Sequence, residues 1–222
     1  MRKKWPAILW ILPLMLLSAC QSLDVVARDS TASFDALIKA VPEDIMPDDN
    51  IGGYALEAPD GSARFLWSQD FSQSVYDAWL ETDITPFVEA GLDTTRLPED
   101  MVHEGLLIIG ADFGNEPPSY SGEATPIKAY EQIVKYKRDN IGYHAALDHY
   151  GINLDGGHMF EWAKNLQTND KDIVFVLSPQ PFLDAGADPN KIPGWVFAKV
   201  ETMEDKGNNV QVDKLLKPFN IQ

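Results

Sequence analysis

The chain repeats itself over part of its length. When the sequence is shifted by 95 positions, residues 60–98 align with residues 155–193 without a gap, and eleven positions are identical. Such a repeat predicts two copies of one structural unit that pack together. We expect the shared residues to build the fold, with glycines in turns, prolines at bends and aromatic residues in the core. Among the shared residues are Gly61, Trp67, Pro86, Phe87 and Gly91 in the first copy, and Gly156, Trp162, Pro181, Phe182 and Gly186 in the second.

Each copy opens with a pattern typical of an amphipathic helix. Apolar residues recur at helical spacing over 34–41 and again over 127–134. Thr125 and Pro126 supply an N-cap and a first helical residue for the second of these helices. The sequence therefore predicts one helix at the start of each unit.

Three strands, a short helix and a last strand follow in each copy. The turns PDGS and LDGG favour hairpins. The run DIVFVLS, at 172–178, is apolar and β-branched enough to be a strand that is buried on both faces. The motifs PFVEAG and PFLDAG predict one helical turn that begins at a proline and ends at a glycine. GLLIIGAD at 105–112 and GWVFAKVE at 194–201 supply the last strand of each copy.

These elements predict an α+β fold. Each unit contains a helix, three strands, a short helix and a strand, in mainly antiparallel sheets with helices on one side. The units span residues 31–115 and 116–222, and we expect them to pack as one globular body in a pseudo-twofold arrangement. The segment 113–124 is rich in proline, glycine and serine, which is typical of a connection between units.

The N-terminus has the parts of a secretory signal peptide. Arg2, Lys3 and Lys4 form a basic head, and the apolar run from Trp5 to Leu17 is shorter than the roughly 20 residues that a bilayer span requires. The motif LSAC, which ends at Cys20, resembles the lipobox of bacterial lipoproteins. An ordinary signal peptide and an uncleaved anchor are the alternatives.

The lipobox resemblance implies that cleavage falls before Cys20 and that its sulfur receives a diacylglyceryl group. An N-acyl chain on the same residue would add to the anchor, because a single acyl chain binds a membrane only marginally. Residues 1–19 are then a signal peptide and residues 20–30 a tether. This reading predicts a lipid anchor at the outer face of the cell membrane.

The body of the chain resembles a group of uncharacterised lipoproteins of Gram-positive anaerobes. The residues that carry the resemblance are TPFVEAGLD, YEQIVKYKRDNIGYHAALDHYG and TNDKDIVFVLSPQPFLDAGADPNKIPGWVFAKV. The resemblance implies a lipoprotein and assigns neither an activity nor catalytic residues.

The predicted mature chain is strongly acidic. Removal of the basic head leaves 15 basic residues against 34 acidic ones, a net charge of −19. Such a surface repels nucleic acid and makes cations or cationic partners more favourable. The alternative interpretation is that the charge serves solubility outside the cell.

Histidines are concentrated in one segment of the second copy. The motif DNIG occurs at 49–52 and 139–142, an offset of 90, so the second copy contains five extra residues between this motif and the aligned block. Imidazoles near carboxylates are typical transition-metal ligands, and the candidates are His144, Asp148, His149 and His158. In a continuous strand, however, His144 and Asp148 share one face while His149 lies on the other. A polar hairpin with solvated histidines is the alternative.

The catalytic motifs that we sought are absent from the sequence. HEGLL at His103 lacks the second histidine of a zinc-protease helix, and there is no Gly-x-Ser-x-Gly elbow and no Gly-Lys-Ser phosphate loop. We therefore expect a non-catalytic binding or interaction module, with a cation, small-molecule or protein ligand in the groove between the repeats. A metal-binding protein or metal-dependent enzyme that uses the hairpin 143–158 is the alternative. No cofactor is predicted besides the lipid on Cys20.

Overall fold

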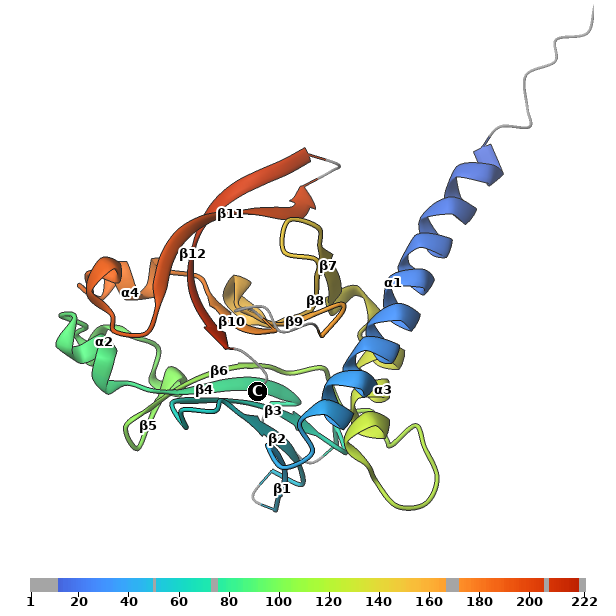
Figure 1. Ribbon diagram of the computed structural model, residues 1–222, viewed down its shortest axis with the longest axis horizontal. Coiled ribbons are helices and arrows are strands. Elements are labelled where there is room, and N and C mark those ends of the chain that lie inside the picture. Colours follow the sequence, from blue (N-terminus) through green and yellow to red (C-terminus); the bar gives the residue numbers. More distant parts are fainter. Residues whose placement is uncertain (1–11, 50, 73–75, 167–171, 206–207, 220–222) are drawn as a thin grey trace, which may run out of the picture.

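The computed structural model describes residues 12–49, 51–72, 76–166, 172–205 and 208–219, with side chains described from Asp24 onward except over 201–210. Within these ranges two six-stranded antiparallel sheets form the body of the molecule (Figure 1). In spatial order the first sheet contains β1 (Ile45–Asp48), β2 (Gly53–Glu57), β3 (Ala63–Ser68), β4 (Ala78–Asp83), β6 (Leu106–Ala111) and β5 (Val102–His103). The second contains β7 (Ile141–His144), β8 (His149–Asn153), β9 (Met159–Ala163), β10 (Ile173–Leu177), β12 (Asn208–Phe219) and β11 (Val196–Asp205). The predicted α+β fold is confirmed.

Helices flank the sheets at two places. The α-helices are α1 (Leu12–Ala40), α2 (Thr85–Glu89), α3 (Pro126–Tyr136) and α4 (Gln180–Asp184). Short 3₁₀ turns lie at Thr94–Arg96, Glu99–Met101, Arg138–Asn140, Asp155–Gly157 and Pro189–Lys191. The longer helices α1 and α3 lie together on one side of the sheets, and α2 and α4 lie at the opposite end (Figure 1). As predicted, the Thr125 side chain caps α3 by accepting a hydrogen bond from the Lys128 N–H, and Pro126 is its first residue.

The two sheets repeat one strand order, so the second is a copy of the first. Equivalent residues of the two units also touch, which only residues near a twofold axis can do. Three equivalent aromatic pairs meet: Phe65 with Phe160 at 4.0 Å between ring centroids, Phe34 with Tyr130 at 4.1 Å, and Phe87 with Phe182 at 5.1 Å. The pseudo-twofold axis therefore runs through one aromatic core that the sheets share.

The short helices α2 and α4 meet across the same axis. The Asp93 N–H donates to the Ala185 carbonyl and the Asp188 N–H donates to the Ala90 carbonyl, both at 2.9 Å. Gly91 ends the α2 turn at φ 101°, a conformation that glycine adopts without strain. A Cβ added there would lie 3.2 Å from the Gly186 carbonyl oxygen. Both the turn and the close approach of the units require the shared glycine.

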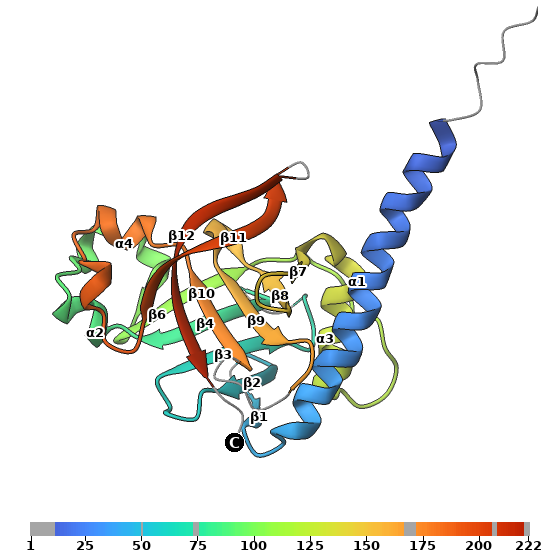
Figure 2. The same cartoon turned by 45° about the horizontal axis from the view of Figure 1, so that its top comes forward.

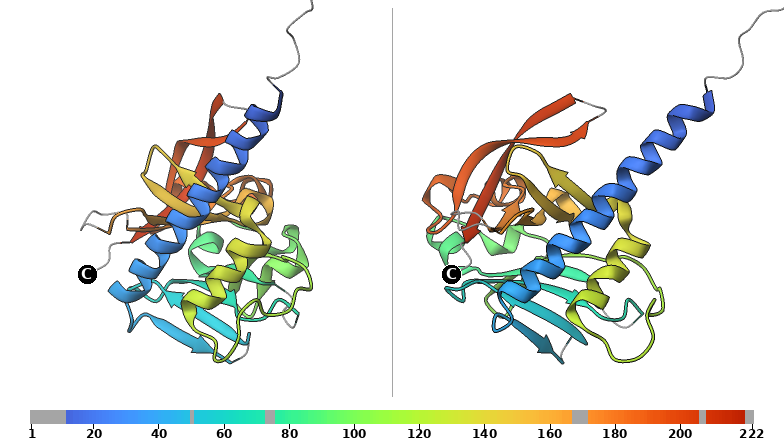
Figure 3. Two further views of the ribbon diagram at one scale, coloured as in Figure 1. Left: turned by 90° about the vertical axis from the view of Figure 1, so that its right-hand side faces the viewer. Right: turned by 45° about the vertical axis from the view of Figure 1, so that its right-hand side comes forward.

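The long helices are exchanged between the units. α1 precedes the first sheet but contacts β7, β8 and β9 of the second, whereas α3 contacts β2 and β3 of the first. The two helices lie side by side in both views of Figure 3. They run antiparallel, because Asp24 of α1 pairs with Arg138 while Phe34 stacks on Tyr130. This exchange interlocks the two halves of the chain.

Strand registers correct the predicted five-residue insertion. Asp48 of β1 is paired with Gly53 of β2, and His144 of β7 is paired with His149 of β8. Four residues lie in each hairpin loop, at 49–52 and 145–148, so the hairpins match in length. The DNIG motifs are not equivalent, because the first lies in sequence between β1 and β2 whereas the second leads into β7. Alignment of this short motif misplaced the second hairpin.

The strand count within each unit was also wrong. Four strands, rather than three, precede the short helix, and two, rather than one, follow it. GWVFAKVE contributes to β11, the counterpart of the two-residue β5, and β12 takes the place that β6 has in the first sheet. The long β11–β12 hairpin curves away from the body (Figure 2). It is the largest structural difference between the two sheets.

The predicted tether is part of the fold over its second half. α1 is continuous through residues 24–30, and there Ala27 and Ser30 are buried. The Tyr130 hydroxyl donates a 3.0 Å hydrogen bond to Ser30 Oγ. Residues 1–11 of the predicted signal peptide and the Cys20 side chain lie outside the described part of the chain. Within that part, no helix combines the length and the apolar character that crossing a membrane requires.

Candidate functional site

Two of the predicted histidines meet around a buried carboxylate. His144 and His149 lie side by side at the facing ends of β7 and β8. His144 Nδ1 lies 3.2 Å from Glu161 Oε1, and His149 Nδ1 lies 3.6 Å from Glu161 Oε2. The Glu161 side chain is 1% exposed. Burial alone would raise the pKa of Glu161, but the hydrogen bond with His144 and the charges of both imidazoles hold that pKa below its ordinary value.

The other two candidates lie elsewhere. Asp148 is exposed, adopts φ 55° in the β7–β8 turn, and accepts a hydrogen bond from the Tyr143 hydroxyl. Because this turn interrupts the strand, His144 and His149 share a face, contrary to the expectation from a continuous strand. His158 lies beyond the other end of β8, where its Nδ1 accepts a hydrogen bond from the Ser178 N–H at 3.2 Å. Burial and the Lys214 charge lower the pKa of His158 to about 4.

The four predicted ligands therefore do not form one site. Among the residues described, no group of three or more histidine, cysteine, aspartate or glutamate side chains has an arrangement that could hold a metal ion.

Sequence reasoning missed Glu161, although the repeat contains a signal for it. Glu161 stands between the shared Phe160 and Trp162, at the position that Leu66 has in the first copy. In the first sheet Leu66 packs instead with Ala55 and Trp79 on the outer face. The charge at a position that the other copy fills with leucine sets this face of the second unit apart from that of the first.

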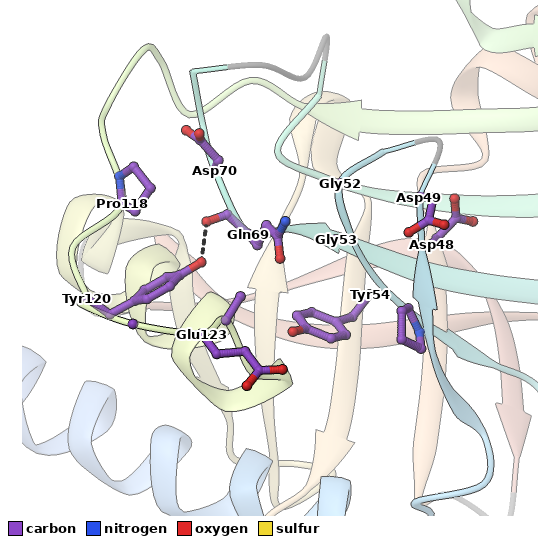
Figure 4. Close-up of a pocket in the computed structure, with 13 residues that line it drawn as sticks. Asp48, Asp49, Gly52, Gly53, Tyr54, Gln69, Asp70, Pro118, Tyr120 and Glu123 are labelled. Carbon is purple, nitrogen blue, oxygen red and sulfur yellow. Dashed lines mark hydrogen bonds between the residues drawn. The ribbon is translucent and has the colours of Figure 1, made fainter.

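A cavity of about 710 Å³ opens in the first unit (Figure 4). It lies where β1, β2 and β3 end, against the segment that connects the units. The residues that line it are Pro47, Asp48, Asp49, Gly52, Gly53, Tyr54, Gln69, Asp70, Pro118, Tyr120, Gly122, Glu123 and Ala124. It is thus built from strand ends of the first sheet and from residues 118–124, which belong to the span that we assigned to the second unit.

Hydrogen bonds fix the connecting segment against the first sheet. The Tyr120 hydroxyl donates to the Gln69 carbonyl at 2.8 Å (Figure 4). Gln132 of α3 donates to the same carbonyl at 2.5 Å through Nε2, and its Oε1 accepts from the Ser119 N–H at 3.0 Å. The segment is therefore held by α3 and β3 together, although its sequence is typical of a loose connection. One wall of the cavity is preformed by these bonds.

The cavity is strongly acidic. Among the described residues its lining contains four carboxylates, Asp48, Asp49, Asp70 and Glu123, and no lysine, arginine or histidine. Burial and the nearby Glu123 carboxylate raise the pKa of Tyr54. Burial, Tyr54 and Asp70 raise the pKa of Tyr120. Both phenols therefore stay neutral at physiological pH within a field of negative charge.

Comparison with protein-family models, curated proteins and solved structures gives no match to this chain. The resemblance to lipoproteins accordingly stays a prediction from the sequence.

The cavity could not be predicted from single residues. Its walls come from three stretches, 47–54, 69–70 and 118–124, that only the fold brings together. The sequence does show an acidic pair at Asp48 and Asp49 in the first copy, where the second has His144 and Ala145. That difference between the copies was the available signal.

Proposed function

We propose that this protein is a lipid-anchored, extracytoplasmic binding protein without catalytic activity, and that it holds a small ligand in the cavity of its first unit. The cavity carries the proposal. Its volume of about 710 Å³ falls in the range of roughly 300 to 1,000 Å³ that is usual for small-molecule sites. Its walls are strand ends and a hydrogen-bonded segment, which supports a preformed site.

The orientation of α1 is consistent with this role. The N-terminal turns of α1 project from the body (Figure 1), and the helix, which contains Cys20, ends at Ala40. Because α3 runs antiparallel to α1, its N-terminal end, which follows the Glu123 wall of the cavity, lies far from the N-terminal turns of α1 (Figure 3). A helix rises 1.5 Å per residue, so Cys20 to Ala40 spans roughly 30 Å. A lipid on Cys20 would leave the cavity facing away from the membrane.

The anchor is tested by mass spectrometry of the N-terminal peptide. The full chain is produced in a bacterial host and recovered from its membranes. We expect the peptide to begin at Cys20 and to contain a diacylglyceryl group, and the Cys20→Ala variant to remain unprocessed. An N-terminus elsewhere, or an unmodified Cys20, would refute the anchor.

The ligand site is tested by blocking the cavity. Ala124→Trp places a large ring at the cavity wall, whereas Ala145→Trp places the same ring in the exposed β7–β8 loop. A panel of small molecules is screened by thermal shift against the unaltered chain and both variants. Ligands that stabilise the unaltered chain and Ala145→Trp, but not Ala124→Trp, are the expected result. Equal stabilisation of both variants, or no stabilisation by any compound, rejects the cavity as the binding site.

A further inference from the structure

The carboxylates of the cavity are distributed around it rather than gathered at one point. Figure 4 shows Asp48 and Asp49 on the right, Asp70 at the upper left and Glu123 below, with Tyr54 between Glu123 and the aspartate pair and Tyr120 at the left below Asp70. Arg64 Nη1 approaches Asp48 Oδ2 at 3.6 Å from outside the lining, so the remaining charge in the cavity stays negative. A ligand that is complementary to these carboxylates has positively charged groups at separate positions.

The tyrosines offer ring faces to a cation between those charges. An ammonium group within about 6 Å of an aromatic ring centroid is attracted by the ring quadrupole. The chain already uses Tyr120 in this way, because Lys128 Nζ lies 5.7 Å from its ring centroid and donates to the Glu123 carbonyl at 2.7 Å. Lys128 is not among the residues that line the cavity, so this contact shows that the Tyr120 ring can hold an ammonium group.

In the second unit, a lysine ammonium lies at the position that is equivalent to this end of the cavity. Strand registers make Pro47 equivalent to Tyr143, and Gln69 follows β3 as Lys164 follows β9. Lys164 Nζ lies 5.5 Å from the Tyr143 ring centroid. In the first unit that ammonium is replaced by the neutral side chain of Gln69, which lines the open cavity. Because Pro47 stands where Tyr143 does, the first unit lacks both the ammonium and the ring of this pair at the corner that opens into the cavity.

We propose that the cavity binds an aliphatic polyamine, a flexible molecule with several ammonium groups joined by methylene chains. The ammonium groups pair with the carboxylates on opposite sides of the cavity, and the methylene chain lies along the tyrosine rings. A single small ion would not fill the cavity and would not contact carboxylates on opposite sides of it. This inference rests on the proposed function, because it names the ligand class of the same cavity.

The test is calorimetric titration with spermidine at 150 mM NaCl, where attraction by distant surface charges is screened. We expect one spermidine per chain. The double variant Asp49→Asn with Glu123→Gln keeps the side-chain shapes and removes two lining charges. It should weaken spermidine binding by about tenfold or more. The matched control, Asp139→Asn with Glu131→Gln, removes two exposed charges outside the cavity and should change the Kd less than about twofold.

Uncharged and anionic probes distinguish failure of the polyamine proposal from failure of the proposed binding function. The probes are 1,8-octanediol and suberate, which are elongated like spermidine but lack cationic groups. Binding of either probe in a manner that Ala124→Trp abolishes, without binding of spermidine, rejects the polyamine class and retains the binding function. If the cavity variant and the control variant weaken spermidine binding equally, the polyamine site is rejected, because the result indicates diffuse attraction to the acidic surface. Binding of none of the three probes also rejects the polyamine class, and the wider thermal-shift screen then decides the binding function.

Discussion

Glu161 occupies in the second sheet the place that Leu66 occupies in the first. Its carboxylate is buried between His144 and His149, and Gly151 leaves room for it, because a Cβ there would lie 3.0 Å from Glu161 Cγ. A buried charge of this kind is held by its partners rather than by solvent. Loss of one partner therefore costs more than loss of a surface ion pair.

Replacement of Glu161 by glutamine removes the charge that both imidazoles face. We expect Glu161→Gln to lower the free energy of unfolding by about 3 kcal/mol at pH 7, measured by urea denaturation. The pKa of Glu161 is lowered on folding, so its stabilising contribution is present above its ordinary value of 4.5 and fades as the pH falls through the folded value. The difference from the unaltered chain should close in acid. A difference that is absent at pH 7 would show that the cluster contributes no stability.

Asp77 shows the opposite behaviour. Its Oδ2 accepts a hydrogen bond from the Phe113 N–H at 2.6 Å, and its Oδ1 is buried without a hydrogen-bond partner among the described residues. Burial raises the pKa of Asp77 to about 7. The folded state thus prefers the protonated acid, and a stability penalty develops as the pH rises from the ordinary value of 3.8 and is complete above about 7.

Asp77→Asn keeps the acceptor for Phe113 and stays neutral at every pH. We predict that it raises the free energy of unfolding by about 2 kcal/mol at pH 8, because no buried charge is left unsatisfied. The same variant should match the unaltered chain at pH 4, which serves as the control. Equal stability of the two chains at pH 8 would show that Asp77 is not destabilising when ionised.

At the scale of elements, the contact between α2 and α4 depends on backbone approach. Gly91→Ala introduces strain at φ 101° and also brings a Cβ to 3.2 Å from the Gly186 carbonyl oxygen. Gly105→Ala is the matched control, because Gly105 adopts φ 88° with nothing within 4 Å of an added Cβ. We expect Gly91→Ala to be less stable than Gly105→Ala by about 1 kcal/mol in thermal or urea unfolding. Equal losses would mean that strain alone determines the effect.

The N-terminal turns of α1 are a second element whose role can be measured. A chain that begins at Thr31 loses buried Ala27 and the Ser30 acceptor of the Tyr130 hydroxyl, whereas a chain that begins at Ser22 keeps both. We predict that the shorter chain is less stable by about 2 kcal/mol in urea. The Ser30→Ala variant of the longer chain isolates the hydrogen bond. Equal stability of the two truncated chains would restore the interpretation of residues 22–30 as a simple tether.

Elements with strong local signals were predicted well. Thr125 and Pro126 gave the start of α3, and the run around β10 gave a strand whose residues are all buried. β12 was missed because its pattern includes Lys214 and Lys217, which read as exposed. Lys217 is instead buried, with its Nζ 5.9 Å from the Trp195 ring centroid and 3.8 Å from Asp60 Oδ2. Such tertiary partners cannot be inferred from local periodicity.

The candidate site was less accessible to prediction than the fold. The repeat directed attention to positions that differ between the copies, and the histidine segment contained part of the buried Glu161 cluster. The cavity was not anticipated, because the hydrogen bonds that position Tyr120 and Glu123 come from α3 and from the end of β3. Those contacts exist only once the exchanged helices are in place.

At the scale of the whole molecule, two similar units differ in where they place their carboxylates. One unit fills its outer face with apolar residues and opens an acidic cavity at its strand ends, and the other encloses a carboxylate between imidazoles. The overall negative charge alone does not select a site, because it attracts polyamines to the entire surface. The location of the bound ligand therefore decides between a specific cavity site and diffuse binding to the surface.

The most direct test of the account is a map of backbone amide shifts by nuclear magnetic resonance as spermidine is added at 150 mM NaCl. We predict saturable shifts that concentrate in residues 47–54, 69–70 and 118–124, with the pseudo-equivalent residues 143–150 of the second unit unaffected. Shifts that spread over the acidic surface without saturation, or that concentrate around the second sheet, would contradict a cation site in the first unit.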